Sequence, residues 1–422
     1  MSLVLTLIQQ MLAGTNIDKN EYRASRYGAL DAFMVQSQDP MGILTDDIKQ
    51  KARDSQGKSL ITTVIDYDGG VTVTHDRPLT ITDHENTSRH LQINFATYSF
   101  GFTMVPMLYK NNEIGYQRDF ATKLRGCELA LAKMLDEAAL AAIAANKTTV
   151  ISNPLLYDAT GNVINAKWTE RENVLGDLGV IMGADDFFGD IDVVCDAGVE
   201  SLVRKLAQHG LYNDVNKANE YAGKRFFFTN NIARGAYTTK SHASDTGFVN
   251  VATNKWEGQP GTTKQTGAST YQTPTAFTPV AAGSNIYGRG YAIGKGTLGI
   301  LTRFEPDCVN GTKMQDGHEW GIATLPLLGL PIGTYFYESA GDYSGIQATG
   351  AEHLVRTRKE HFGFSVDIAF VTAYNSDPTH VASPILAFNI SSEDASYAKP
   401  VFVVNQTQAA AGGSGSGTGT SS

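Results

Sequence analysis

The segment between residues 113 and 146 most constrains the fold, because it carries a helical repeat far longer than any other in the chain. Apolar residues recur there at steps of three and four positions: Phe120, Leu124, Cys127, Leu131, Met134, Leu135, Ala138 and Ala142. Two pairs of opposite charges, Asp119 with Lys123 and Lys133 with Glu137, stand four residues apart. The pattern predicts one long amphipathic helix over this segment.

An excursion of two strands is predicted just before this helix. Residues 60–65 alternate in the manner of a strand, Asp66–Gly70 is a turn signal, and the alternation returns from Leu91 to Thr97. Residues 60–105 are therefore expected to form a two-stranded hairpin with a charged tip. Because an isolated ribbon of two strands is barely stable in water, we expect it to pack on another subunit.

The rest of the chain mixes helix and strand signals, which indicates an α+β protein. Strands are predicted at 191–194, 224–229, 287–303, 332–337 and 362–372, and a helix at 199–209. Residues 238–285, rich in Thr, Gly, Ser and Ala, are expected to form long surface loops. Residues 4–12 have the spacing of a short amphipathic helix, and residues 409–422 have the composition of a flexible tail.

Composition excludes several classes of protein. With 34 Lys and Arg against 43 Asp and Glu, the formal charge is −9, which argues against a protein that coats nucleic acid through a basic face. The three cysteines are far apart and form no Cys-x-x-Cys pair, so neither a disulfide framework nor a cysteine zinc site is expected. The N-terminal stretch is a poor signal peptide, and no run approaches about 18 apolar residues, so we expect a soluble protein that is not secreted.

The sequence offers no catalytic, cofactor-binding or metal-binding constellation. Gly294–Gly299 has the letters of a dinucleotide loop, but its strand-like surroundings favour a tight turn in a β region. His75, His84 and His90 lie near one another at the polar hairpin tip, where solvated histidines are expected rather than a metal site. We therefore expect no enzyme activity, no cofactor and no metal, and a structural role.

Eight fragments stand in a particular order along the chain: Gln92–Phe95, Phe102–Pro106, Asn112–Tyr116, Phe120–Leu124, Leu131–Asp136, Gly189–Cys195, Phe226–Asn231 and Glu360–Phe364. In this order they resemble the Hong Kong 97-type major capsid protein of tailed bacteriophages. The resemblance implies an α+β fold of that type, with an N-terminal arm, an extended β-hairpin loop, a long spine helix in a peripheral domain and a mixed axial domain.

The same resemblance implies a division of the chain into segments. These are an N-terminal arm at 1–59, the extended loop at 60–110, a peripheral domain at 111–175 with its spine helix at 113–146, an axial domain at 176–345 with a loop-rich stretch at 238–285, peripheral return strands at 346–408, and a flexible tail at 409–422.

The function implied is self-assembly into the icosahedral shell, made of pentamers and hexamers, that encloses a double-stranded DNA phage genome. The implied partners are further copies of the chain, a portal, a separate scaffolding protein, a decoration protein and, through weak non-specific contact, the packaged DNA. The implied location is the virion, after assembly in the bacterial host cytoplasm and without a membrane. Some relatives cross-link an extended-loop lysine, whereas no lysine lies between Lys58 and Lys110 here, so non-covalent contacts are expected to hold the shell.

Two other interpretations stay open. An encapsulin-like cellular compartment shares this fold. A β-rich carbohydrate-binding or hydrolytic surface protein is the other, and it would require a cluster of carboxylates or aromatic residues in a cleft, which the sequence does not show.

The charged end of the hairpin supplies the candidate site residues. Arg77, Asp83, Glu85 and Arg89 are too polar to pack within the subunit's own core. We expect these four residues to form ion pairs with neighbouring subunits.

Overall fold

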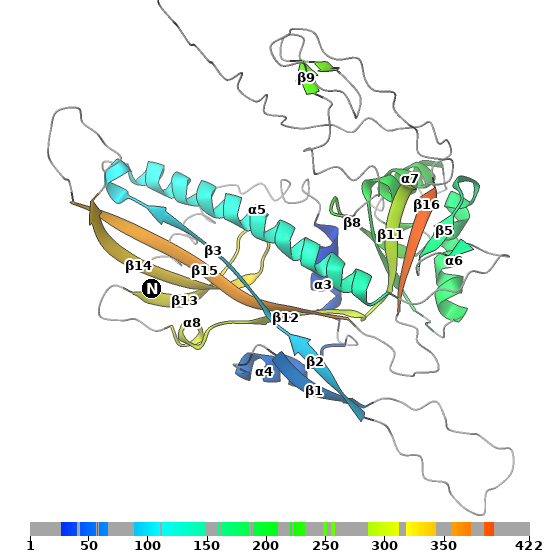
Figure 1. Ribbon diagram of the computed structural model, residues 1–422, viewed down its shortest axis with the longest axis horizontal. Helices are drawn as coiled ribbons and strands as arrows, with labels where there is room; N and C mark the ends of the chain where they lie inside the picture. The colour runs from blue at the N-terminus through cyan, green and yellow to red at the C-terminus, as the bar shows by residue number, and fades with distance from the viewer. Residues whose placement is uncertain are drawn as a thin grey trace, which may run out of the picture.

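The computed structural model describes residues 27–39, 43–55, 57, 59–65, 88–109, 112–147, 158–159, 163–184, 187, 189–209, 220–221, 223–232, 248–250, 255–257, 286–311, 318–342, 356–372 and 384–391. The helix expected at 4–12, the hairpin tip and the tail at 409–422 lie outside these residues. A mixed α+β fold is confirmed (Figure 1).

Five of the described strands form a sheet around β15 (Arg356–Thr372). One edge of β15 pairs with β14 (Pro331–Asp342) and then β12 (Leu298–Arg303), and β14 pairs with β13 (Glu319–Thr324). The other edge of β15 pairs with β3 (Ala96–Met104). Successive residues of a strand point to opposite faces, so the even-numbered residues of β15, such as Phe362 and Phe364, form one face, which is buried.

Seven described strands form the second sheet, in the order β4–β5–β16–β11–β6–β8–β7. Their bounds are Asp158–Ala159 (β4), Ile164–Ala166 (β5), Ile385–Ser391 (β16), Ile286–Gly294 (β11), Ile191–Cys195 (β6), Lys224–Phe228 (β8) and Glu220–Tyr221 (β7). Helices α6 (Arg171–Ala184) and α7 (Ala197–His209) pack on the face that includes Val193. Helix α3 (Gly28–Gln36) and the end of α5 pack on the face that includes Val194.

Helix α5 (Glu113–Ala145) belongs to the cores of both sheets (Figure 1). Its first half packs Phe120 and Leu124 against the aromatic face of the five-stranded sheet. Its last turns pack Leu140 and Ile143 against the seven-stranded sheet. At 33 residues it spans about 50 Å, so a single rigid element fixes the two sheets relative to each other.

Asp136 of α5 is a fully buried carboxylate that ties three elements together. Its Oδ1 accepts hydrogen bonds from the backbone N–H groups of Ala29 (2.9 Å) and Leu30 (3.1 Å), which lie in the first turn of α3. Its Oδ2 accepts from the Thr229 hydroxyl (2.6 Å) and the Asn231 side-chain amide (2.6 Å), just after β8. Asp136 therefore caps α3, whose own N-cap residue makes no side-chain cap.

Glu128, two turns earlier on α5, is also fully buried. Its Oε1 accepts from the backbone N–H groups of Leu327 (2.7 Å) and Leu328 (2.8 Å), in the turn between β13 and β14. Its Oε2 has no partner among the described residues. Burial raises the pKa of Glu128 to about 7, against the lowering effect of the two N–H groups.

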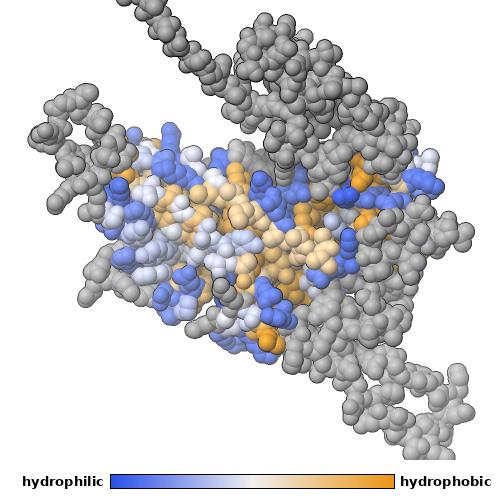
Figure 2. Space-filling view, viewed as in Figure 1, coloured by the Kyte–Doolittle hydropathy of each residue, from blue (hydrophilic) through white to orange (hydrophobic). Residues whose placement is uncertain are grey.

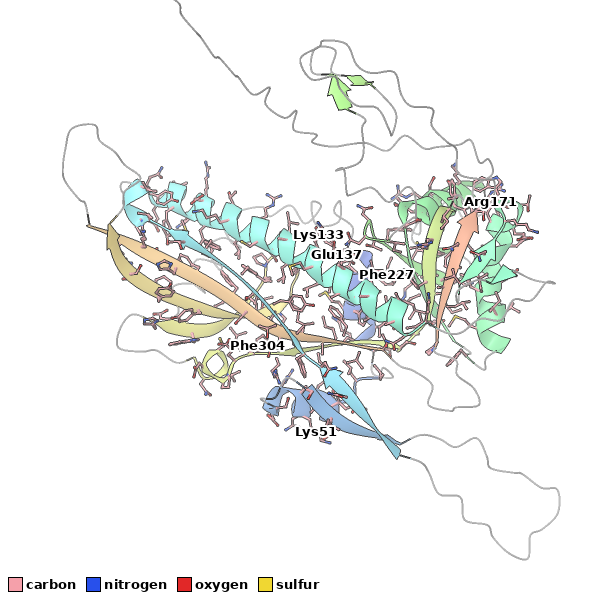
Figure 3. The ribbon with its side chains drawn as sticks, in the orientation of Figure 1. Lys51, Lys133, Glu137, Arg171, Phe227 and Phe304 are labelled. Atoms are coloured by element: carbon pink, nitrogen blue, oxygen red, sulfur yellow. The ribbon has the colours of Figure 1, made fainter. Side chains whose placement is uncertain are left out.

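The predicted helix over 113–146 is confirmed, with Asn112 as its N-cap and Asn146 as its C-cap. The expected pair of Asp119 with Lys123 forms at 2.9 Å. Lys133 and Glu137 form no ion pair in the described structure (Figure 3); both are exposed, where such a pair is worth little.

The other predicted elements are largely confirmed, with one addition. Strands β6, β8, β11, β12, β14 and β15 and helix α7 lie where strands and a helix were predicted. Within the segment 238–285 the structure describes a small antiparallel pair, β9 (Phe248–Asn250) with β10 (Lys255–Glu257), which the loop prediction missed.

The prediction that residues 60–105 form one two-stranded excursion is wrong for residues 96–104. These residues form β3, which leaves the ribbon and pairs with β15 in the five-stranded sheet. Alternating apolar residues, here Phe100 and Phe102, mark a strand but do not say which strand it pairs with.

The expected segment boundaries also differ from the division into sheets. Strands β12, β13 and β14 fall within 176–345 but join β15, while β16, placed among the return strands at 346–408, joins the seven-stranded sheet. The chain therefore passes between the two sheets more often than its linear order suggests. Within the described ranges, the structure contains no helix with the length and apolar character needed to cross a bilayer.

The buried Glu128 predicts a pH dependence of stability. Its pKa is higher in the folded protein than the usual 4.5, so its contribution is complete below about pH 4.5 and is lost as the pH rises through about 7. Glu128→Gln is neutral and keeps an oxygen for both N–H donors. We expect the free energy of unfolding of Glu128→Gln to increase relative to wild type between pH 5 and pH 8, by up to about 3 kcal/mol. The increase is measured as a rise in its melting temperature relative to that of wild type.

The exposed Glu137→Gln on the same helix is the matched control, and its melting temperature should follow wild type across this range. Parallel pH curves for wild type and Glu128→Gln would contradict the buried, titrating carboxyl.

Candidate functional site

The two-stranded ribbon is formed by β1 (Ser59–Ile65) and β2 (Ser88–Asn94), paired antiparallel from Ser59 opposite Asn94 to Ile65 opposite Ser88. At its base, Leu60 and Ile93 are buried against α4 (Asp46–Asp54), β12 and β15. Ile61, which points the other way, is 63% exposed. The base of the ribbon thus packs on the subunit on one side only.

Arg303, at the end of β12, holds this base in place. Its Nε and one terminal nitrogen donate to Asp367 Oδ2 of β15, at 3.1 and 2.7 Å. The other terminal nitrogen donates to the backbone oxygens of Ser55 (2.8 Å) and Gly57 (2.5 Å), just before β1. The guanidinium also stacks 4.4 Å from the centre of the Phe95 ring, just after β2.

Both ends of the ribbon therefore meet at one buried cation. Arg303 is 7% exposed, and Asp367 also accepts from the Thr97 hydroxyl at 2.7 Å. Thr97, Asp367 and Arg303 lie directly across from one another on β3, β15 and β12. We call Arg303, Asp367, Thr97 and Phe95 the ribbon clamp.

The opposite end of the five-stranded sheet carries a second polar network. Tyr116 of α5 donates a short hydrogen bond to Glu360 of β15, and Arg358 contacts both Glu360 (2.6 Å) and Glu338 (2.7 Å). Burial and the Glu360 carboxylate together raise the pKa of Tyr116, which therefore stays protonated as the donor. These contacts fasten the start of α5 to the sheet.

Exposed apolar side chains occur close to this end and along α5. Leu108 of the 3-10 turn Pro106–Tyr109 is 47% exposed, and Ile114 and Met134 of α5 are 65% and 57% exposed. Figure 2 shows a band of hydrophobic residues through the middle of this face, along the course of α5 in Figure 1. The described subunit thus leaves apolar surface uncovered on its longest element.

Three of the four predicted site residues, Arg77, Asp83 and Glu85, lie outside the described residues. Arg89 lies in β2, where its backbone is opposite Val64. The side chains of these four residues are thus outside what the structure describes, and their role stays a prediction.

Sequence reasoning missed the ribbon clamp. Arg303 and Asp367 are 64 residues apart, in strands whose pairing no local pattern specifies. The expected tight turn at Gly294–Gly299 is confirmed: it joins β11 to β12, with Gly296 at φ 80°. Among the described residues, no three His, Cys, Asp or Glu side chains are grouped as metal ligands.

Comparison with known proteins gives structural similarity alone. No family model and no curated protein matches the sequence. The chain is similar to the capsid of Ralstonia phage GP4 (9% identity, TM-score 0.38, 81% of this chain and 85% of that chain). It is similar to the capsid of an empty GTA particle (10%, 0.38, 83% and 92%) and to the capsid of cyanophage Pam1 (12%, 0.39, 81% and 87%). Because these TM-scores are below 0.5, we base the functional proposal on the geometry of the chain itself.

The ribbon clamp predicts a specific defect for Arg303→Ala. The change removes a bidentate ion pair, two bonds to backbone oxygens and the contact with Phe95, and it leaves Asp367 with one partner fewer. We expect a loss on the order of 3 kcal/mol in subunit stability, with increased proteolysis of the ribbon base, measured by thermal unfolding and limited digestion.

Arg171→Ala is the matched control, because Arg171 also stacks on an aromatic ring, 4.5 Å from the centre of Trp168, but far from the ribbon along the chain (Figure 3). A ribbon that is digested at the same rate in Arg303→Ala as in Arg171→Ala would contradict the clamp.

Proposed function

We propose that this chain is a major capsid protein of a tailed bacteriophage, whose copies assemble as pentamers and hexamers into the icosahedral shell around double-stranded DNA. The observation that carries the proposal is the ribbon β1–β2, whose base is fastened by the ribbon clamp and which, at Ile61, keeps an apolar side chain exposed. Two-stranded ribbons are marginal alone, so a second copy is the natural partner for the uncovered side.

The arrangement around α5 supports the same proposal. One helix in the cores of two sheets makes a stiff, elongated subunit, as a shell built from identical copies requires. In this proposal α5 is the spine helix, the five-stranded sheet belongs to the peripheral domain and the seven-stranded sheet to the axial domain. The extended loop occupies the first part of residues 60–110, before β3. In this proposal the N-terminal arm buries surface on other copies.

The remaining partners follow from this role and are also proposals. A portal, a separate scaffolding protein and a decoration protein complete the particle, which assembles in the host cytoplasm. A net charge of −9 limits the contact with packaged DNA to a weak, non-specific one. The protein acts in the virion as a structural component and not as an enzyme.

Assembly is tested by electron microscopy and sedimentation of the purified protein. We expect the wild-type protein to form closed icosahedral particles. A matched variant replaces residues 66–87 by Asn-Gly, which joins the directly opposed Ile65 and Ser88 through a two-residue turn. It should stay folded and fail to close shells. A wild-type protein that is only a compact monomer under all assembly conditions would refute the proposal.

The hairpin tip gives a second prediction. We propose that Arg77, Asp83, Glu85 and Arg89 form ion pairs between subunits, so Arg77→Ala with Arg89→Ala should fold normally but lower particle stability. Each exposed pair is worth about 0–1 kcal/mol, and repetition over many copies makes the sum measurable. The effect should grow weaker as salt screens the wild-type pairs.

The control removes two positive charges elsewhere. Lys49→Ala with Lys51→Ala breaks exposed pairs with Asp46 (3.6 Å) and Asp47 (2.7 Å) within α4, and should leave particle melting unchanged. Tip-variant particles that melt like wild type at every ionic strength would show a solvated tip without a partner.

A further inference from the structure

The five-stranded sheet has an outer face, formed by the odd-numbered residues of β15, that points away from α5. At one end, Ala369 and Val371 are covered by α4 and the ribbon base. In the middle, α8 (Pro306–Asn310) covers Gly333, where an added Cβ would lie 3.0 Å from the Cys308 sulfur. Beyond Gly333, toward Tyr337 and His361, no described element covers this face.

Five aromatic and imidazole side chains stand together on this uncovered part. They are His318, Trp320, Tyr335, Tyr337 and His361, here called the aromatic block. The rings of Tyr337 and His361 are 4.3 Å apart at 9°, and those of Trp320 and Tyr335 are 4.9 Å apart at 36°. All five side chains are only partly buried, so the block is not part of the core.

A low floor lies beside the block. Trp320, Tyr335, Gly363 and Gly101 lie directly across from one another on β13, β14, β15 and β3. Gly363 presents bare backbone next to the Tyr335 ring, since a Cβ added there would meet Tyr335 at 3.6 Å, and Gly101 continues this bare surface on β3. Hydroxyl side chains continue this floor: Ser99, Thr103, Ser339 and Ser365.

The polar edges of the block are only partly used within the subunit. His361 bonds the Thr103 hydroxyl (3.0 Å) and the Ser339 hydroxyl (2.8 Å) through its two ring nitrogens, and His318 bonds the Tyr335 hydroxyl (2.7 Å). The Trp320 indole N–H and the Tyr337 hydroxyl have no hydrogen-bond partner among the described residues. The indole N–H is available as a donor, and the hydroxyl is available as a donor or an acceptor.

The composition of this face decides between ligand classes. Beside the aromatic block and its hydroxyl floor, the only aliphatic side chain described there is Ile322, and the only charge is Lys359. A nucleic acid would need a group of cations. A sugar presents apolar C–H faces to aromatic rings and hydroxyls to polar edges, and it needs no cations. Aromatic residues also occur at protein interfaces, so the test below includes a variant that separates a protein-docking surface from a sugar site.

We propose that the aromatic block and its glycine floor bind a neutral carbohydrate, with a sugar ring against Trp320 and sugar hydroxyls bonded to the Trp320 N–H and the Tyr337 hydroxyl, because His318 and His361 already cover the two faces of the Tyr337 ring. This adds a binding activity to the chain and does not depend on its assembling into a shell. It also supplies the aromatic cluster that the sequence did not reveal, because four of the five residues come from three strands and His318 precedes the first of these strands.

The test is binding of the purified full-length protein, assembled or not, to an array of neutral oligosaccharides of glucose, galactose, mannose and N-acetylhexosamines. We expect at least one class to bind, and binding to fall at least tenfold in Trp320→Ala and in Tyr337→Ala. Trp320→Phe keeps a ring face and should lose less. Ile322→Ala, on the same face of the same strand, should bind within twofold of wild type.

If Trp320→Ala does not fold, Tyr337→Leu, which keeps apolar volume, gives the same comparison. Several results would overturn the proposal. They are no retention of any neutral glycan by wild type, equal binding by wild type and the ring variants, or a loss in Ile322→Ala as large as in Trp320→Ala, which would indicate a protein-docking surface. Ring variants that lower the melting temperature while wild type binds no glycan would assign the block to strand pairing alone.

Discussion

The fold depends on α5 lying in two hydrophobic cores at once. Apolar packing alone would allow the helix to slide or rotate, since aliphatic contacts have little directionality. The buried carboxylates of Asp136 and Glu128 remove that freedom, because each accepts hydrogen bonds from backbone N–H groups of a different segment. Moving either sheet along α5 would leave a buried polar group without a partner, which costs more than the bond itself gains.

The ribbon depends on this frame through the ribbon clamp. Arg303 stands on β12 and Asp367 on β15, and both strands are positioned by the core that α5 covers. Arg303 contacts the chain just before β1, at Gly57, and just after β2, at Phe95. These contacts fix the direction of the ribbon at its base, while Ile61 stays exposed. A ribbon that is fixed at its base and exposed on one side is suited to complete its packing on another molecule.

Much of the secondary structure could be predicted from sequence, because α5 and the strands of both sheets have clear periods. The partners of those strands could not. Residues 96–104 continue the alternation of the ribbon yet pair with β15, more than 250 residues later. The ribbon clamp and the aromatic block could not be predicted for the same reason. Each is brought together by the register of strands that are far apart in the sequence, and no local sequence pattern specifies that register.

Hydrogen–deuterium exchange, compared between unassembled subunits and assembled particles, tests the central claim most directly. The ribbon is expected to pack on a second copy, so its amides beyond the clamped base, in residues 61–65 and 88–92, should exchange readily in the subunit and become protected on assembly. Amides of α5, buried in the subunit's own cores, should be protected in both states. Equal protection of the ribbon before and after assembly, or a protein that forms no assembly, would contradict the account.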